Sequence, residues 1–260
     1  MKMKKIAAAL LVAGASLAPM AANAASVGLE LLLLVDVSGS VSGTEYALQK
    51  TGYVNAFNSA AVQNAIFGSQ GGSIAVSYAE WSGAGQISRL VNWTKISTIG
   101  EANAFANAIN LTNRAFANNT AIQSAMNDSK TWFGTETGGT DNGFESLRQV
   151  MDVSGDGARN EGLTGTQGRD AALAAGVDTI NGIYIAGEGG LDAYYNNFVK
   201  GGAGGFVEAA NTFEDFSAAI QRKLIREITH ETPEPLSAAL VGIGLFGLGL
   251  SRRRQKQVQA

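Results

Sequence analysis

The most constraining feature of the sequence is an apolar run, Leu29–Val37, that is interrupted only by Glu30 and Asp36. A run of this length without regular alternation is typical of a strand buried on both faces of a sheet. Ser42 and Glu45 then follow with the spacing of a helix capping box, and apolar residues recur at helical spacing after them. A buried strand that leads directly into a helix predicts an α/β fold with a mostly parallel sheet.

The alternation of strand and helix patterns continues along the chain to about residue 228. Further strands are predicted at Gly72–Trp81, Ile87–Trp93, Leu147–Val153, Ile180–Ala186 and Gly205–Val207. Helices are predicted near Ile99–Ile109, Ala121–Phe133, Thr166–Ala175, Leu191–Val199 and Phe213–Ile228. In the last helix, Arg222, Lys223 and Arg226 are expected to form a solvated face that the helix dipole favours. The order predicts one doubly wound domain, with helices on both sides of a mostly parallel central sheet.

The start of the chain has the pattern of a secretory signal peptide. Three lysines precede an apolar run, and Ala22-Asn23-Ala24 follows as a site with small residues at the cleavage positions. We therefore predict that residues 1–24 are a signal peptide, that the protein is exported, and that residues 25–231 form the mature domain.

The end of the chain has three parts in order: Pro233-Glu234-Pro235, an apolar run over residues 236–250, and three arginines at 252–254. This tail resembles the PEP-CTERM sorting signal of bacteria that use exosortase. The resemblance implies that residues 232–260 hold the protein at the membrane through a short transmembrane segment, 236–250, until processing releases it. The protein is then expected in the cell envelope or at the surface. A simple short anchor is the alternative.

Composition narrows the possible functions. Between the two ends, residues 25–251 carry 12 basic against 22 acidic side chains. A domain with this excess of negative charge repels phosphate backbones and attracts cations. We therefore expect no binding to nucleic acid. The chain has no cysteine, which excludes disulfides, thiolate metal ligands and cysteine nucleophiles.

The main candidate for a functional site is Asp36-Val37-Ser38-Gly39-Ser40, at the point where the predicted central strand ends and a helix begins. In doubly wound sheets, ligands bind at the carboxyl ends of the strands. Asp36, Ser38 and Ser40 offer three hard oxygen atoms within one tight loop, and such atoms suit magnesium (Mg²⁺) or Mn²⁺. The alternative is an Asp–Ser turn that only caps the helix.

This strand-loop-helix arrangement resembles the metal-ion-dependent adhesion site (MIDAS) of von Willebrand factor A (vWA) domains. In that family a Thr that opens a helix and an Asp after the fourth strand complete the site. Thr120 and Asp156 stand in the matching chain order, although Thr112 and Thr140 also lie in similar loops. The resemblance implies that Ser38, Ser40 and Thr120 are hydroxyl ligands. It also implies that Asp36 and Asp156 contact the metal mainly through bound water, or accept hydrogen bonds from the ligands.

Three further stretches, Tyr78–Gly83, Val153–Gly157 and Lys223–Ile228, resemble a bacterial subfamily of vWA domains whose function is unassigned. Neutral hydroxyl ligands would leave a bound ion with excess positive charge and a replaceable water. The Asp or Glu carboxylate of a partner protein could take that place. We therefore expect a metal-dependent protein-binding module for adhesion or assembly, and no enzyme.

Other functions remain open at this stage. A haloacid-dehalogenase-like phosphatase would use Asp36 as nucleophile, but Ser38 occupies the position where a second carboxylate acts as general acid. A serine hydrolase would depend on the only histidine, His230, which lies beside the tail. Asp152–Gly157 matches half of an EF-hand loop, whose twelfth position is Leu163 instead of Glu. A structural envelope protein without a working metal site is the last alternative.

Overall fold

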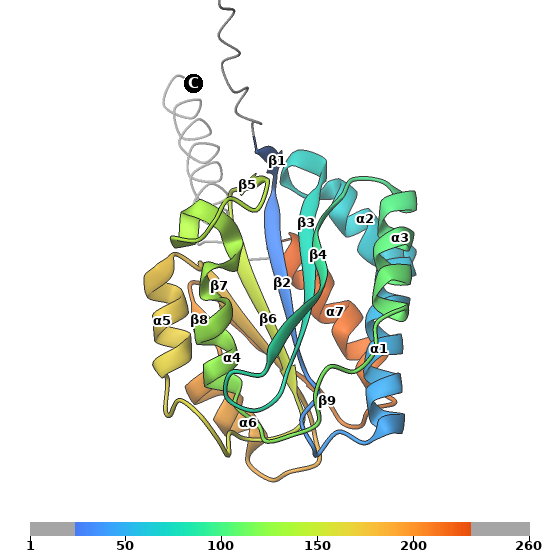
Figure 1. The fold of residues 1–260 in the computed structure, drawn as a ribbon. Coiled ribbons are helices and arrows are strands. Elements are labelled where there is room, and N and C mark those ends of the chain that lie inside the picture. Colours follow the sequence, from blue (N-terminus) through green and yellow to red (C-terminus); the bar gives the residue numbers. More distant parts are fainter. Residues whose placement is uncertain (1–23, 230–260) are drawn as a thin grey trace, which may run out of the picture.

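The structure is a computed structural model that describes residues 24–229. Its central sheet has seven strands in the order β4-β3-β2-β6-β7-β8, and β9 also pairs with β7 (Figure 1). The strands β2, β3, β6, β7 and β9 are parallel, whereas β4 and β8 run antiparallel to their neighbours. Their bounds are β2 (Leu29–Asp36), β3 (Ile74–Trp81), β4 (Ile87–Ile96), β6 (Gln149–Gly155), β7 (Thr179–Ile185), β8 (Gly201–Gly202) and β9 (Val207–Ala210).

Helices cover both faces of this sheet, so the predicted doubly wound α/β fold is confirmed. Leu31 and Leu33 of β2 pack into the core beneath one helical layer, and Leu32 and Leu34 pack into the core on the opposite face. Every residue of β2 is buried, as its unbroken apolar run predicted. The first layer contains α1 (Gly43–Asn58), α2 (Ala60–Gly68), α3 (Ile99–Asn110) and α7 (Phe216–Thr229), and the second contains α4 (Ile122–Ser129), α5 (Gln167–Ala175) and α6 (Leu191–Tyr194).

Several boundaries differ from those predicted. The first helical pattern is split at Ser59, whose hydroxyl accepts a hydrogen bond from Val62 N and so caps a new helix, α2. The predicted helix over Ala121–Phe133 ends at Ser129 and continues as a 3₁₀ segment, Lys130–Thr137. A small sheet of β1 (Ala25–Val27) and β5 (Phe144–Ser146) was not predicted.

The expectation that Lys223 lies on a solvated face is wrong. Arg222 is exposed and pairs with Glu208, but the side chain of Lys223 is 0% exposed. Its Nζ atom lies 2.6 Å from Asp152 Oδ1 of β6 and 2.6 Å from Glu227 Oε1, one turn further along α7. Burial raises the pKa of Glu227 to about 8, so this buried triad retains a proton at neutral pH. Asp152 lies within β6 and pairs with Lys223, so it does not begin a calcium-binding loop. This contradicts the EF-hand alternative.

Several predictions fall outside the described residues. They are the signal peptide up to residue 23, the sorting tail with its segment 236–250, and His230. Within residues 24–229, no helix combines the length and apolar character needed to cross a membrane.

Candidate metal centre

The loop after β2 is folded by its own short side chains. Ser38 N donates a 2.7 Å hydrogen bond to Oδ1 of Asp36, the last residue of the strand. This bond turns the chain so that the hydroxyl oxygens of Ser38 and Ser40 lie 3.2 Å apart. Ser38 is buried and Ser40 is exposed, so the pair spans the distance from the interior to the surface.

Two other loops reach the same place. Thr120, which lies just before α4, donates from Oγ1 to Ser38 Oγ at 3.2 Å. Asp156, the first residue after β6, accepts a 2.7 Å bond from Ser40 Oγ at Oδ1. All five residues singled out in the sequence, Asp36, Ser38, Ser40, Thr120 and Asp156, are therefore brought together at one sheet edge.

The structure distinguishes Thr120 from the two other threonines considered. The hydroxyl of Thr112 donates to the carbonyl of Ile109 at the end of α3. Thr140 precedes β5, which pairs with β1 at the opposite end of β2 from Asp36. Only Thr120 of the three has its hydroxyl beside Ser38.

Arg114 joins the loop after β2 to the loop that carries Thr120, and it was not identified from the sequence. Its guanidinium donates to the carbonyl oxygens of Val37 at 2.9 Å and Ser38 at 2.8 Å, and also to Phe116 of its own loop at 2.8 Å. An additional bond runs from Gly39 N to the carbonyl of Asn118 at 2.6 Å. A lone arginine in a polar loop carries no sequence signal for such a role.

The site contains two carboxyl groups, those of Asp36 and Asp156, whose pKa values are raised. Asp36 is fully buried, and burial, together with repulsion from Asp156, raises its pKa to about 7. Burial also raises the pKa of Asp156. Asp36 Oδ2 has no hydrogen-bond partner within the described part of the chain. A nearby cation would compensate both carboxylates and lower both pKa values.

The donor set fits a small divalent cation. In an octahedral Mg²⁺ site, ligands at about 2.0–2.1 Å from the ion lie about 3 Å from one another. The two hydroxyl separations of 3.2 Å are close to this spacing. Across residues 24–229, no group of three or more His, Asp or Glu side chains is placed to hold a metal ion. At this site the three hydroxyl oxygens lie beside the two carboxylates of Asp36 and Asp156.

Tyr195 is a second residue that the sequence did not indicate. It lies on a π-helical turn, Tyr195–Val199, is fully buried, and its hydroxyl has no partner among the described residues. A Cβ atom at Gly155 would lie 2.6 Å from Tyr195 Oη and 2.8 Å from Asp36 Oδ2. The missing side chain of Gly155 thus lets these two unpartnered oxygens approach each other beneath the site.

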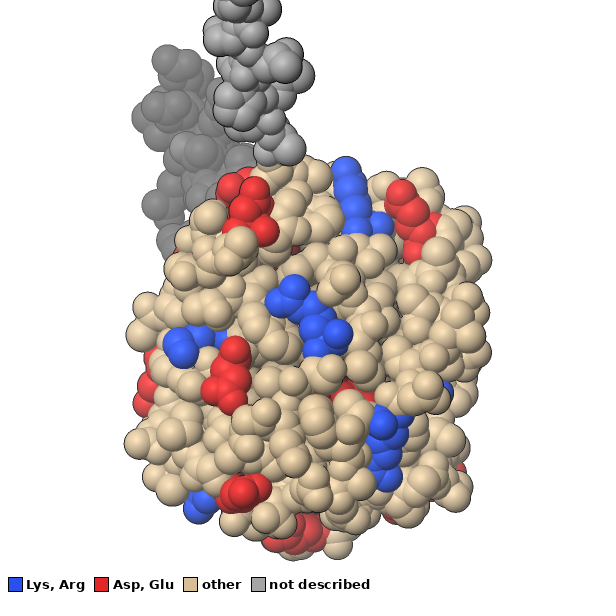
Figure 2. Space-filling model, viewed as in Figure 1, with Lys and Arg blue, Asp and Glu red and all other residues tan. Residues whose placement is uncertain are grey.

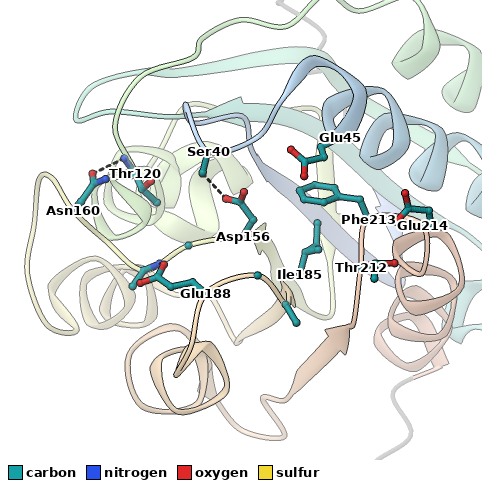
Figure 3. Close-up of a pocket in the computed structure, with 14 residues that line it drawn as sticks. Ser40, Glu45, Thr120, Asp156, Asn160, Ile185, Glu188, Thr212, Phe213 and Glu214 are labelled. Carbon is teal, nitrogen blue, oxygen red and sulfur yellow. Dashed lines mark hydrogen bonds between the residues drawn. The ribbon is translucent and has the colours of Figure 1, made fainter.

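A cavity of about 500 Å³ opens beside Ser40, Thr120 and Asp156, and we call it the site cavity (Figure 3). Its other walls come from the loops after β6, β7 and β9 and from the start of α1. They comprise Glu45, Gly157, Ala158, Asn160, Ile185, Ala186, Gly187, Glu188, Thr212, Phe213 and Glu214.

Several solved structures share this fold. Proximal thread matrix protein 1 from the mussel byssus, in a form whose MIDAS motif holds zinc, is 15% identical, with a TM-score of 0.54 over 78% of this chain and 48% of that one. The pilus adhesin SpaC from Lactobacillus rhamnosus GG is 15% identical, with a TM-score of 0.55 over 78% and 31%. A von Willebrand factor type A protein from Catenulispora acidiphila is 13% identical, with a TM-score of 0.51 over 78% and 43%.

These likenesses show a vWA-like fold, and the chain spans about half or less of the length of each of these proteins. No curated protein shows significant similarity. A family model does match residues 26–232, which is most of the chain. The chain therefore belongs to the family described as protein of unknown function (DUF1194).

Proposed function

We propose that this protein is an exported, metal-dependent protein-binding module for adhesion or assembly. Ser38, Ser40 and Thr120 would hold Mg²⁺ or Mn²⁺ through their hydroxyl oxygens, with Asp36 and Asp156 acting on those ligands or through water. The observation that supports this most directly is the convergence of the three hydroxyls at 3.2 Å spacings beside the carboxylates of Asp36 and Asp156.

In this proposal the two carboxylates orient the hydroxyl ligands, and Ser40 presents the cation to solvent. Asp156 accepts the hydrogen of Ser40, which orients a hydroxyl lone pair away from the carboxylate. Asp36 fixes the loop through Ser38 N and remains buried. When bound, the cation supplies a positive charge with an exchangeable position. Because Ser40 is exposed at the site cavity, a partner's Asp or Glu carboxylate could reach that position.

The fold neighbours support an adhesive role at the cell envelope. One is a byssal thread protein with a zinc-occupied MIDAS motif, and another is a pilus adhesin. We place the protein in the envelope, anchored through the C-terminal segment 236–250 or released to the surface after processing. The phosphatase alternative is disfavoured because Asp36 is 0% exposed and cannot attack a substrate as a nucleophile.

Isothermal titration of the full chain with Mg²⁺ and with Mn²⁺ tests the metal site. We expect saturable binding that Ser40→Ala removes or weakens strongly. Ser26→Ala is the matched control, because Ser26 is an exposed serine of β1 away from the site. No saturable binding, or equal binding by both variants, would leave the structural envelope protein as the better interpretation.

Affinity capture from envelope extracts, with and without EDTA, tests the binding role. Partners that are lost both with EDTA and in Ser38→Ala would support it. Hydrolysis of a phosphate ester by the wild type, abolished in Asp36→Asn, would instead show the phosphatase.

A further inference from the structure

The site cavity has an unbalanced charge. Four of its fourteen lining residues are carboxylates: Glu45, Asp156, Glu188 and Glu214. Among the described residues, none of those that line it is Lys or Arg. The carboxylates come from three separate segments in addition to the loop after β6. Figure 2 shows acidic side chains reaching the surface at the lower end of the molecule, where the strands β2 and β6 of Figure 1 end.

Two of these carboxylates are held in place by the backbone. Glu45 accepts a 2.7 Å bond from Ser42 N as part of the capping box of α1. Glu188 accepts a 3.1 Å bond from Ala158 N in the loop after β6. Their charges are therefore held near the cavity before any ligand arrives. A ligand of complementary charge can then bind without the entropic cost of ordering these two side chains.

The cavity also has an apolar wall. Ile185 at the end of β7 is buried, and the ring of Phe213 is partly exposed. In Figure 3 these side chains lie between Asp156 on one side and Glu214 on the other, with Glu45 close to the ring of Phe213. An apolar surface with carboxylates around it suits a side chain that has an aliphatic stem and a cationic end.

Charge balance then restricts the ligand. A divalent cation would compensate only two of the four carboxylates. A partner that brought nothing but its own carboxylate would add a further negative charge to a cavity that already has an excess of them. Like charges placed side by side oppose binding, whereas a complementary cation favours both encounter and register.

We propose, resting on the function proposed above, that the partner segment is zwitterionic. Its Asp or Glu completes the metal site, and a Lys or Arg a few positions away enters the site cavity. The basic side chain lies along Phe213 and Ile185 and pairs with Glu45 and Glu214. The partner is thus a protein segment in which an acidic and a basic residue lie close together.

A random peptide library displayed on phage tests this proposal. The immobilised full chain is loaded with Mg²⁺, and bound phage are eluted with EDTA. We expect the eluted peptides to be enriched in Asp or Glu with Lys or Arg nearby. For the best such peptide, replacing its basic residue with Gln should weaken binding about threefold to tenfold, as expected for two partly exposed ion pairs. Binding should also weaken between about 0.05 M and about 0.3 M salt.

Paired variants of the protein provide the control. Glu45→Gln with Glu214→Gln removes two charges from the cavity and keeps an acceptor for the capping box. Asp128→Asn with Glu145→Gln removes two exposed charges elsewhere. The first pair should abolish the preference for a basic residue while saturable Mg²⁺ binding is retained, and the second should change neither.

The outcomes separate this inference from the proposed function. Eluted peptides with an acidic residue but no enrichment in Lys or Arg would overturn the inference and leave the metal-dependent module intact. The absence of EDTA-eluted peptides, together with no Mg²⁺ binding by titration, would overturn both.

Discussion

Replacing Gly155 with Ala should disturb the candidate metal centre from beneath. The added Cβ would lie 2.6 Å from Tyr195 Oη and 2.8 Å from Asp36 Oδ2, whereas ordinary contacts begin at 3.4 Å. The two oxygens would have to move by about 0.8 Å and about 0.6 Å. Both belong to fully buried side chains, so neither can swing into solvent.

The size of the effect follows from this crowding. One extra methyl group in a packed interior costs about 1–3 kcal/mol of the free energy of unfolding. A shift of the Asp36 carboxylate also moves the Ser38 backbone that it accepts from. Displacing a group that orients metal ligands lowers metal affinity by about 10–100-fold. We therefore expect a folded, moderately destabilised protein that binds Mg²⁺ at least about tenfold more weakly.

Urea denaturation and Mg²⁺ titration measure the two effects separately. Gly157→Ala is the matched control, because its Cβ would meet only Glu188 Oε2 at 3.5 Å, an ordinary contact. That variant should keep both stability and affinity close to wild type. If Gly155→Ala remains folded and binds Mg²⁺ as tightly as Gly157→Ala, the position of the Asp36 carboxylate does not matter for the site, and the reasoning fails.

Three other predictions concern residues whose roles the sequence did not predict. Arg114→Gln should weaken Mg²⁺ binding about tenfold in titrations, because the carbonyls of the Ser38 loop lose their donor; unchanged affinity would show that the loops hold their shape without it. Lys223→Met should cost about 3–5 kcal/mol in urea denaturation, because it leaves two buried carboxylates without their cation; a loss below about 1 kcal/mol would contradict this. Burial raises the pKa of Glu227 from an ordinary 4.5 to about 8, so the stability that its bound proton contributes is fully present below pH 4.5 and is lost as the pH rises through 8. The free energy of unfolding should therefore fall between about pH 5 and pH 8 in the wild type more than in Glu227→Gln, and parallel profiles would refute the assignment.

The parts of the fold and site that the sequence predicted are those encoded by contiguous residues. The apolar run that forms β2, the capping box at Ser42 and the Asp36–Ser40 loop each contain their own signal, because the unbroken apolar run, the cap spacing and the hard oxygens are local. Thr120 was harder to identify, since Thr112 and Thr140 stand in similar loops and only the folded chain brings one of them to Ser38.

The features that were missed depend on partners distant in the chain. Lys223 and Glu227 at i and i+4 on a helix look like a solvated pair, and only the approach of Asp152 from β6 makes that helix face buried. Tyr195 reaches the site because Gly155 has no side chain, a fact that neither residue reveals alone. The strand predicted at Gly205–Val207 is β9, Val207–Ala210, and β8, Gly201–Gly202, was not predicted, because the glycines before β9 give this region weak strand propensity.

The bonds of Arg114 define what would have to be moved if this site were grafted onto another scaffold. Transferring the Asp36–Ser40 segment alone would leave the carbonyls of Val37 and Ser38 without their donor. The smallest transferable unit is thus the three loops that carry Ser38, Thr120 and Asp156, with Arg114 to join the first two. A designer who copied only the serines would transfer two of the three candidate hydroxyls without the geometry that aligns them.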